Sequence, residues 1–424
     1  MNEFDVKNTE HSAPAVPYKK FVKQMSKWYS TGELPELASQ DLRFVLELQK
    51  QKLRSLGLDM KCELKKKGSD RINSGDTSYS DRVFKNTFIS GNAGMTRNVV
   101  STQDQLTKYT DDIDLMVIIQ ELNDGTQPGD DMPLCCPHCG APSTLGELQA
   151  GCKHCGTHFL MSELYPKVMN YFTFENHDIK QTKIKNKHDL TTLIIASIIP
   201  MIIICILFNL FAGQAQNTIA NVIFGLFGGI LGGAMVGGIL FVFKKLFESL
   251  RLMGKQLRGI GHLVSTLLNA DKIKQNDPEF SSEYFRDKIT SLFRMAVYSK
   301  DATALSCCKC RCPKEAAEII EARLHNFSII SCQIKDMICD VNLILYLDCL
   351  HCRDGKIKIK SDKYRMRMRK QIKTPTGLGF SFSAVSCPSC GASFDARNVK
   401  ACPYCNNEYL HEEHDWIITD LKRI

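Results

Sequence analysis

Two long apolar stretches stand out in the pattern of hydrophobic and polar positions along the chain. Residues 190–212 and 218–243 are almost uninterrupted in apolar side chains, and the polar segment AGQAQN lies between them. Each has roughly the 20 residues that a helix needs to cross a hydrocarbon layer. The pattern therefore predicts a two-helix transmembrane hairpin. Neither stretch contains an ionisable residue, which argues against a transport path.

The chain before the hairpin predicts an α+β domain at 17–134, after a disordered N-terminus at 1–16. Phe21, Met25 and Trp28 recur at helical spacing and share one helix face. Alternating runs bounded by Gly, Asn and Ser predict strands at 58–66, 79–90 and 113–122. A first cysteine ribbon at 135–160 and a basic linker at 161–189 complete this half.

The chain after the hairpin follows a similar plan. Residues 244–278 predict an amphipathic juxtamembrane helix and linker, and residues 280–298 predict a helix. Long alternating runs then predict antiparallel strands of one curved sheet at 327–334, 336–350, 356–372 and 378–385. A second cysteine ribbon at 387–405 lies near the end of this domain, which we place at 279–424.

The cysteines carry the clearest chemistry. The chain has 19 of them, and eight form CxxC pairs, a spacing that presents two thiolates to one metal ion. The pairs predict two closed, structural Zn²⁺ sites, one of Cys136, Cys139, Cys152 and Cys155, the other of Cys387, Cys390, Cys402 and Cys405. Gly140, Gly156 and Gly391 follow ligand cysteines, where tight turns favour glycine. The alternative, a redox dithiol, needs only one such pair.

The two ribbons match each other in sequence. CPHCGA at 136–141 corresponds to CPSCGA at 387–392, and CKHC at 152–155 corresponds to CPYC at 402–405. The gaps between the pairs differ by one residue. This similarity indicates an internal duplication on either side of the apolar stretches.

Six further cysteines leave two interpretations open. Cys307, Cys308, Cys310 and Cys312 lie together, and Cys349 and Cys352 have the spacing of a metal-binding pair. A third metal site is one interpretation. Reduced thiols are favoured, because residues three apart on a strand face opposite sides.

The distribution of charge predicts the orientation of the hairpin in the membrane. The net charge is +8, and basic residues flank both apolar stretches. The positive-inside rule then predicts a multi-pass protein of the cell membrane with both termini in the cytoplasm, where thiols stay reduced. Gly225, Gly229, Gly233 and Gly237 form a ladder in the second stretch that favours close helix packing and homo-oligomerisation.

Residues 356–373 hold nine basic residues and one acidic one. Basic and apolar residues alternate there, so we expect one face of the strand to be basic and the other apolar. A solvated outer face is the simplest interpretation, and a surface for anionic lipid or an acidic protein is the functional one. The strand has no exposed stacking aromatic residue, which weakens the case for nucleic acid.

The C-terminal third resembles a known family. The segment EFSSEYFRDKITSLFRMAVYSKD, the strands from 326 to 351 and the ending from Cys387 to Ile424 are similar to the domain of the mitochondrial inner-membrane import tether, Tim subunit forty-four, in a bacterial membrane-anchored branch with an inserted ribbon. The resemblance implies a cone of helices wrapped by a curved antiparallel sheet, the nuclear-transport-factor-two-like shape. It implies no catalytic residues.

Together these patterns predict an α+β membrane protein in which a transmembrane hairpin joins two cytoplasmic zinc-ribbon domains. We expect a non-enzymatic scaffold that binds protein or anionic lipid at the membrane, because the chain carries no recognisable catalytic motif. The alternative is a membrane-tethered regulator that binds nucleic acid through the ribbons and the basic strand.

Overall fold

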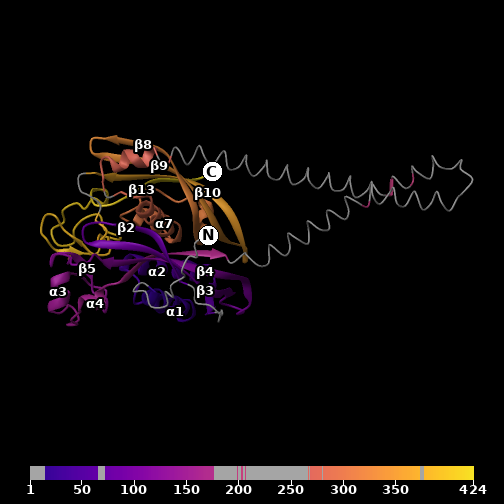
Figure 1. Cartoon of the computed structure of the whole chain (residues 1–424), viewed down its shortest axis with the longest axis horizontal. Coiled ribbons are helices and arrows are strands. Elements are labelled where there is room, and N and C mark those ends of the chain that lie inside the picture. Colours follow the sequence, from indigo (N-terminus) through magenta and orange to yellow (C-terminus); the bar gives the residue numbers. More distant parts are fainter. Residues whose placement is uncertain are drawn as a thin grey trace, which may run out of the picture. The chain divides into compact units, whose positions relative to one another are not determined.

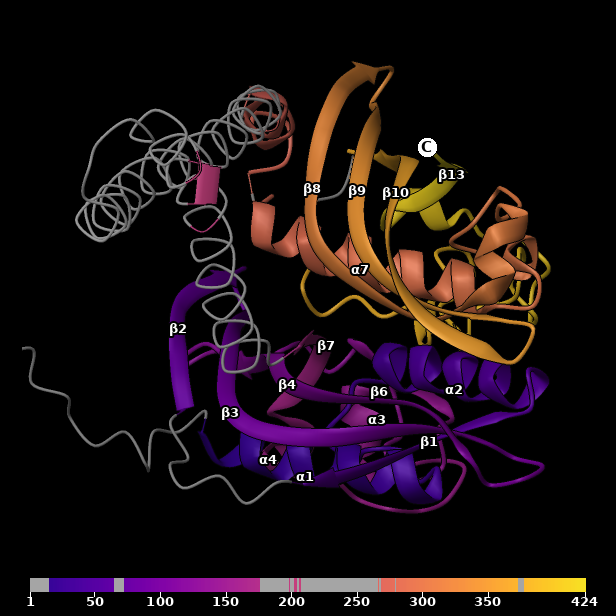
Figure 2. The ribbon, with the colours of Figure 1, turned by 90° about the vertical axis from the view of Figure 1, so that its right-hand side faces the viewer.

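A computed structural model describes residues 15–64, 72–175, 268–278, 280–372 and 377–424, with a few isolated positions between 198 and 266. The two predicted halves of the chain pack into one compact unit. Figures 1 and 2 show this unit from two sides.

The N-terminal half is an antiparallel sheet with two helices. The helices are α1 (Ala15–Thr31) and α2 (Gln40–Ser55), and the strands are β1 (Leu58–Leu64), β2 (Ile72–Ser80), β3 (Phe84–Ser101), β4 (Thr107–Leu122) and β7 (Lys167–Glu175). The sheet has the order β1-β3-β4-β7, and β2 pairs with β3. The predicted face of α1 is confirmed, because Phe21, Met25 and Trp28 are buried. Ser39 begins α2 by accepting a hydrogen bond from the backbone of Leu42.

The C-terminal half wraps a sheet around one helix. α7 (Ser282–Tyr298) precedes β8 (Ile319–Lys335), β9 (Ile338–Arg353), β10 (Lys356–Gln371) and β13 (Ile417–Arg423), and the sheet order is β13-β10-β9-β8. Figure 2 shows β8, β9 and β10 curving past α7. Val341, Leu343 and Leu345 of β9 are fully buried, as the alternating pattern predicts. Asp354 and Gly355 both have positive φ, which suits the two-residue turn between β9 and β10.

The two halves share one order of strands and ribbon, and the internal duplication stays a prediction. In each half a run of antiparallel neighbours is followed by a ribbon and then by a last strand, which pairs with the strand before the ribbon. The first ribbon contains β5 (Pro133–Cys135), β6 (Pro142–Thr144) and the short helices α3 (Leu145–Ala150) and α4 (Met161–Leu164). The second contains β11 (Val385–Ser386) and β12 (Ser393–Phe394). In both halves a helix precedes these strands in the sequence. α2 is followed by β1, and α7 is followed by the short helical turns η1 (Ala302–Ala304) and η2 (Lys314–Glu318) and then by β8.

The predicted membrane architecture is corrected. Within the described residues no helix is long and apolar enough to cross a membrane. The longest, α1 and α7, have 17 residues each and carry charged side chains. The finding contradicts three predictions: the fold class with a transmembrane hairpin, the membrane as a partner of an integral protein, and a multi-pass location in the cell membrane with cytoplasmic termini. The described chain is instead mostly antiparallel sheet with few helices.

Several predicted segments fall where the structure describes little or nothing. The stretches 190–212 and 218–243 lie outside the described residues, apart from four positions in the first. The glycine ladder, most of 244–278 and nearly all of 1–16 also lie outside them.

A buried charge cluster joins the two halves. Arg97 of β3 donates to both oxygens of Asp111, at 3.0 and 2.6 Å, and forms an ion pair with Glu321 of β8. Arg323 donates to Asp111 at 2.6 Å, and Thr173 donates to Glu321 at 2.8 Å. All four charged residues are buried. Burial opposes the charged form of Glu321, but Arg323 and Arg97 outweigh it and lower the pKa of this carboxyl to about 2.

We predict that Glu321→Gln lowers the free energy of unfolding by about 3–5 kcal/mol, because two buried guanidinium groups would then share one carboxylate. Urea unfolding at pH 7 measures this loss. The matched control is Glu33→Gln, which breaks the exposed pair Lys27–Glu33 and should change stability little.

The same substitution should alter the response to acid. Since the folded pKa of Glu321 lies below its ordinary value of 4.5, its contribution is present above that value and is lost as pH falls towards about 2. The free energy of unfolding of the wild type should therefore fall more steeply with decreasing pH between these two values. The variant should lack this part of the pH dependence. An identical pH profile for both proteins would contradict the assignment.

Candidate metal centres

The four CxxC turns of the two ribbons have the same backbone geometry. In each, the carbonyl of the first cysteine accepts from the N–H four residues later, at 2.7–2.9 Å, and its own N–H donates to the carbonyl five residues later. The residue that closes the turn has positive φ, which an L side chain rarely adopts. Glycine fills this position three times, as Gly140, Gly156 and Gly391, and Asn406 fills it in the last turn with φ 58°. The predicted role of the three glycines is confirmed.

The turns bring the predicted ligands together. In each ribbon the four Sγ atoms all lie within 4.8 Å of one another. Cys136–Cys155 and Cys139–Cys152 are separated by 3.7 and 3.8 Å between Sγ atoms, and Cys387–Cys405 and Cys390–Cys402 by 3.6 and 3.7 Å. A tetrahedron with metal–sulfur bonds of about 2.3 Å has edges of about 3.8 Å. Both sets are thus compatible with a structural metal site that has no open position for substrate.

Hydrogen bonds favour the thiolate form at two of these ligands. The N–H groups of Cys390 and Ser389 face the sulfur of Cys387 and lower its pKa to about 6. A hydrogen bond with the Thr157 side chain and another with the Thr157 backbone lower the pKa of Cys155 to about 5. The shift is not shared by all ligands, because burial raises the pKa of the Cys136 thiol to about 12. Metal ions bind the thiolate and not the thiol, so Cys387 and Cys155 are the two ligands whose surroundings favour coordination.

The ribbons also contact each other. β5 lies against β11, and β6 lies against β12. The thiol of Cys135, beside the first ligand, donates to the carbonyl of Ser383 at 3.1 Å. Cys135 is therefore a linking residue between the two halves and not a ligand.

The remaining cysteines do not form a third thiolate cluster within the described chain. Cys308 and Cys310 approach to 3.8 Å between Sγ atoms, and Cys312 donates to the carbonyl of Ala296. Cys349 and Cys352 belong to different hydrophobic clusters, which confirms that they face opposite sides of β9.

One further group of ligand types is buried and was not found from sequence. Cys349, His351 and Asp362 offer atoms within 4.8 Å of one another. The Asp362 carboxylate, however, accepts from His351 at 2.5 Å and from Arg423 at 2.6 Å. The adjacent guanidinium disfavours a divalent cation, so we interpret this group as a buried ion-paired cluster. Its members come from β9, β10 and β13, and only strand pairing brings them together.

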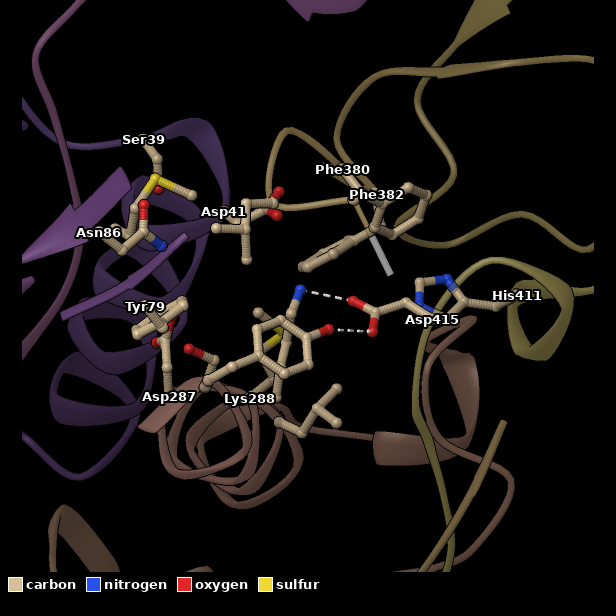
Figure 3. Close-up of a pocket in the computed structure, with 17 residues that line it drawn as sticks. Ser39, Asp41, Tyr79, Asn86, Asp287, Lys288, Phe380, Phe382, His411 and Asp415 are labelled. Atoms are coloured by element: carbon tan, nitrogen blue, oxygen red, sulfur yellow. Dashed lines mark hydrogen bonds and ion pairs between the residues drawn. The ribbon is translucent and has the colours of Figure 1, made fainter. Parts of the chain in front are cut away.

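A polar cavity lies under residues 377–383 (Figure 3). The Lys288 ammonium is ion-paired with Asp415 at 2.5 Å, and the Tyr284 hydroxyl donates to the same carboxylate at 3.0 Å. Tyr79 donates to Asp287 at 2.9 Å, and Ser381 and Ser383 donate to Asp41. The bond of Tyr79 fastens α7 to the N-terminal half, and the bonds of Asp41 fasten the 377–383 segment to it. The bonds of Asp415 stay within the C-terminal half.

The charges in this cavity depend on their neighbours. Burial raises the pKa of Asp41 and of Asp287. Burial would also raise the pKa of Asp415, but Lys288 outweighs it and holds the pKa below the ordinary value. Burial lowers the pKa of His411 to about 4, so this imidazole is neutral at pH 7. The protonation states of these carboxylates and of the Lys288 ammonium are thus set by burial and by neighbouring groups of the protein.

The basic strand differs from its prediction. β10 pairs with β9 without a register shift from Lys356 to Gln371. Lys356, Lys358 and Lys360 therefore face one side of the sheet, and Lys363, Arg365, Arg367 and Arg369 face the other, because alternate residues of a strand share a face. The prediction of one basic face is wrong, because Lys360 and Lys363 are three residues apart and an odd separation places them on opposite faces of the strand.

Comparison with known proteins gives no match: no family model, no curated protein and no solved structure resembles the chain. The similarity to the import-tether family stays a prediction.

We predict that Cys390→Ser removes the metal of the second ribbon and leaves that of the first. Elemental analysis of the purified protein should find half of the wild-type metal content, because three thiolates cannot close a four-ligand site. Cys135→Ser is the matched control, since a hydroxyl can still donate to Ser383, and it should retain the full content. Full metal content in Cys390→Ser would contradict the assignment.

Proposed function

We propose that this protein is a non-enzymatic binding protein whose two ribbons each hold a structural Zn²⁺. Four cysteine sulfurs with the edge lengths of a small tetrahedron suit Zn²⁺. Because each site is closed and the ribbons contact each other, the ions would stabilise the two halves and carry out no reaction.

The binding surface we propose is the outer face of the C-terminal sheet, and its exposed charge is the observation that carries the proposal. Lys363, Arg365 and Arg367 are exposed on this face of β10, and Lys422 of β13 pairs in register with Arg365. A dense group of cations on a rigid sheet favours an acidic segment of a partner protein.

One observation favours single-stranded nucleic acid as a second candidate. Tyr346 of β9 pairs in register with Lys363 and lies half-buried on the same face. The Lys363 ammonium is 5.4 Å from the centre of the Tyr346 ring. An aromatic ring beside basic residues can stack on a base, and it was missed from sequence because it lies on the neighbouring strand.

Fluorescence anisotropy with a labelled poly-glutamate peptide and a labelled single-stranded RNA tests this surface. We predict that the peptide binds in a salt-dependent manner and that the double variant Lys363→Glu/Arg365→Glu weakens binding by about tenfold or more. Lys356→Glu/Lys358→Glu is the matched control, since it changes the net charge by the same amount on the opposite face of the same strand.

The outcome also separates the two candidates. Tighter binding of RNA, weakened further by Tyr346→Ala, would favour the nucleic-acid alternative over the acidic protein. Equal binding by the wild type and the double variant would exclude this face for both partners. Zinc analysis is independent of either result, and we predict about two ions per chain, with loss of folded structure on chelation.

A further inference from the structure

A cleft separate from the ribbons, the polar cavity and the basic sheet face lies where the ends of two helices meet. Its walls are the last turn of α2, the last turn of α7 with the residues that follow it, and the segment that leads into η2. The cleft has a volume of about 650 Å³. Sites for small ligands typically have volumes of about 300–1,000 Å³, so this space has the size of a ligand site.

The floor of the cleft is apolar. Leu56 directly follows α2, Val297 and Tyr298 come from α7, and Pro313 and Ala316 come from the segment opposite. Val297, Tyr298 and Ala316 are buried beneath it. Such a floor favours a hydrocarbon or aromatic group, because covering it removes apolar surface from water.

The rim of the cleft is cationic. Lys300, Arg311 and Lys314 are exposed at its edge, and Lys52 lies half-buried deeper in it. Asp301 is the one carboxylate among the residues that line the cleft. It accepts from the backbone and the hydroxyl of Thr303, at 3.0 and 2.7 Å, so part of its charge is used to cap η1.

Lys52 is bound to backbone carbonyls deeper in the cleft and is not one of the cations at the rim. Its ammonium donates to the carbonyls of Val297 and Ala316, at 2.6 and 2.9 Å. These bonds join α2 to the end of α7 and to η2, and they offset the partial negative charge at the end of α7. Burial lowers the pKa of Lys52 to about 8, which indicates a partly dehydrated site.

We propose that this cleft binds a small amphiphilic anion, a carboxylate or phosphate ester with a compact apolar body. The apolar body would cover the floor, and the anionic group would lie between Arg311 and Lys314 at the rim. The volume of the cleft fits a small molecule better than a polymer. The excess of positive charge at its rim fits an anion better than a neutral lipid. This site is independent of the proposed sheet surface.

The test uses the full-length zinc-loaded protein and the fluorescent anion 8-anilinonaphthalene-1-sulfonate. We expect saturable binding that octanoate or phenyl phosphate displaces and inorganic phosphate does not, because phosphate alone cannot cover the floor. Preference for octanoate or for phenyl phosphate identifies the anionic group. Displacement by inorganic phosphate at an equal concentration would overturn the amphiphilic ligand.

Two variants separate charge from space. Arg311→Glu/Lys314→Glu should weaken binding by about tenfold or more, and Ala317→Trp should abolish it by filling the cleft while the charge is unchanged. Ala317 is an exposed lining residue, so the larger side chain need not disturb the core. Lys358→Glu, on the C-terminal sheet, should bind as the wild type does. Wild-type affinity in both cleft variants, or no saturable binding by the wild type, would overturn the proposal.

Discussion

The buried cluster of Arg97, Asp111, Glu321 and Arg323 is the constraint on which the arrangement of this protein depends. Charges without water are tolerated only when each has close partners of opposite sign. The partners here come from both halves, since Arg97 and Asp111 belong to the N-terminal sheet and Glu321 and Arg323 belong to β8. Any shift of one sheet against the other would leave a buried charge unpaired. The cluster therefore fixes the relative register of the two halves more strictly than apolar contact alone.

The polar cavity and the cleft follow from this fixed register. α2 and α7 precede the main strands of the two halves and contact each other. The cavity lies beside the first turn of α2, at Asp41, and along α7 from Tyr284 to Met295. The cleft lies at the last turns of both helices. Gln49 donates to the carbonyl of Ile320 between these two ends. One helix pair thus lines both the polar cavity and the cleft.

Sequence predicted the features whose causes are local. The ribbons need only CxxC spacing and a residue that tolerates positive φ, and both are visible within a few positions. β9 was predicted because its apolar residues alternate over its whole length. β7 was assigned to a basic linker, because the residues around Lys167–Glu175 are charged and its partner β4 lies far away in sequence. The charge cluster was missed for the same reason, since Arg97 and Glu321 are 224 residues apart and a lone arginine on a strand ordinarily indicates solvent.

The basic residues on both faces of β10 show why the alternating pattern gave a wrong prediction of one basic face. At its start, Ile357 and Ile359 pack into the core of the N-terminal half, so the opposite face, with Lys356 and Lys358, meets water. Further along, Tyr364, Met366 and Met368 pack into the other core. The face with Lys363, Arg365 and Arg367 is now the exposed one. The strand passes from one hydrophobic core to the next, and its basic residues follow the uncovered side. The position of the basic residues is therefore explained by which face of the strand each core leaves exposed. Core packing does not explain why so many of them lie close to Lys422.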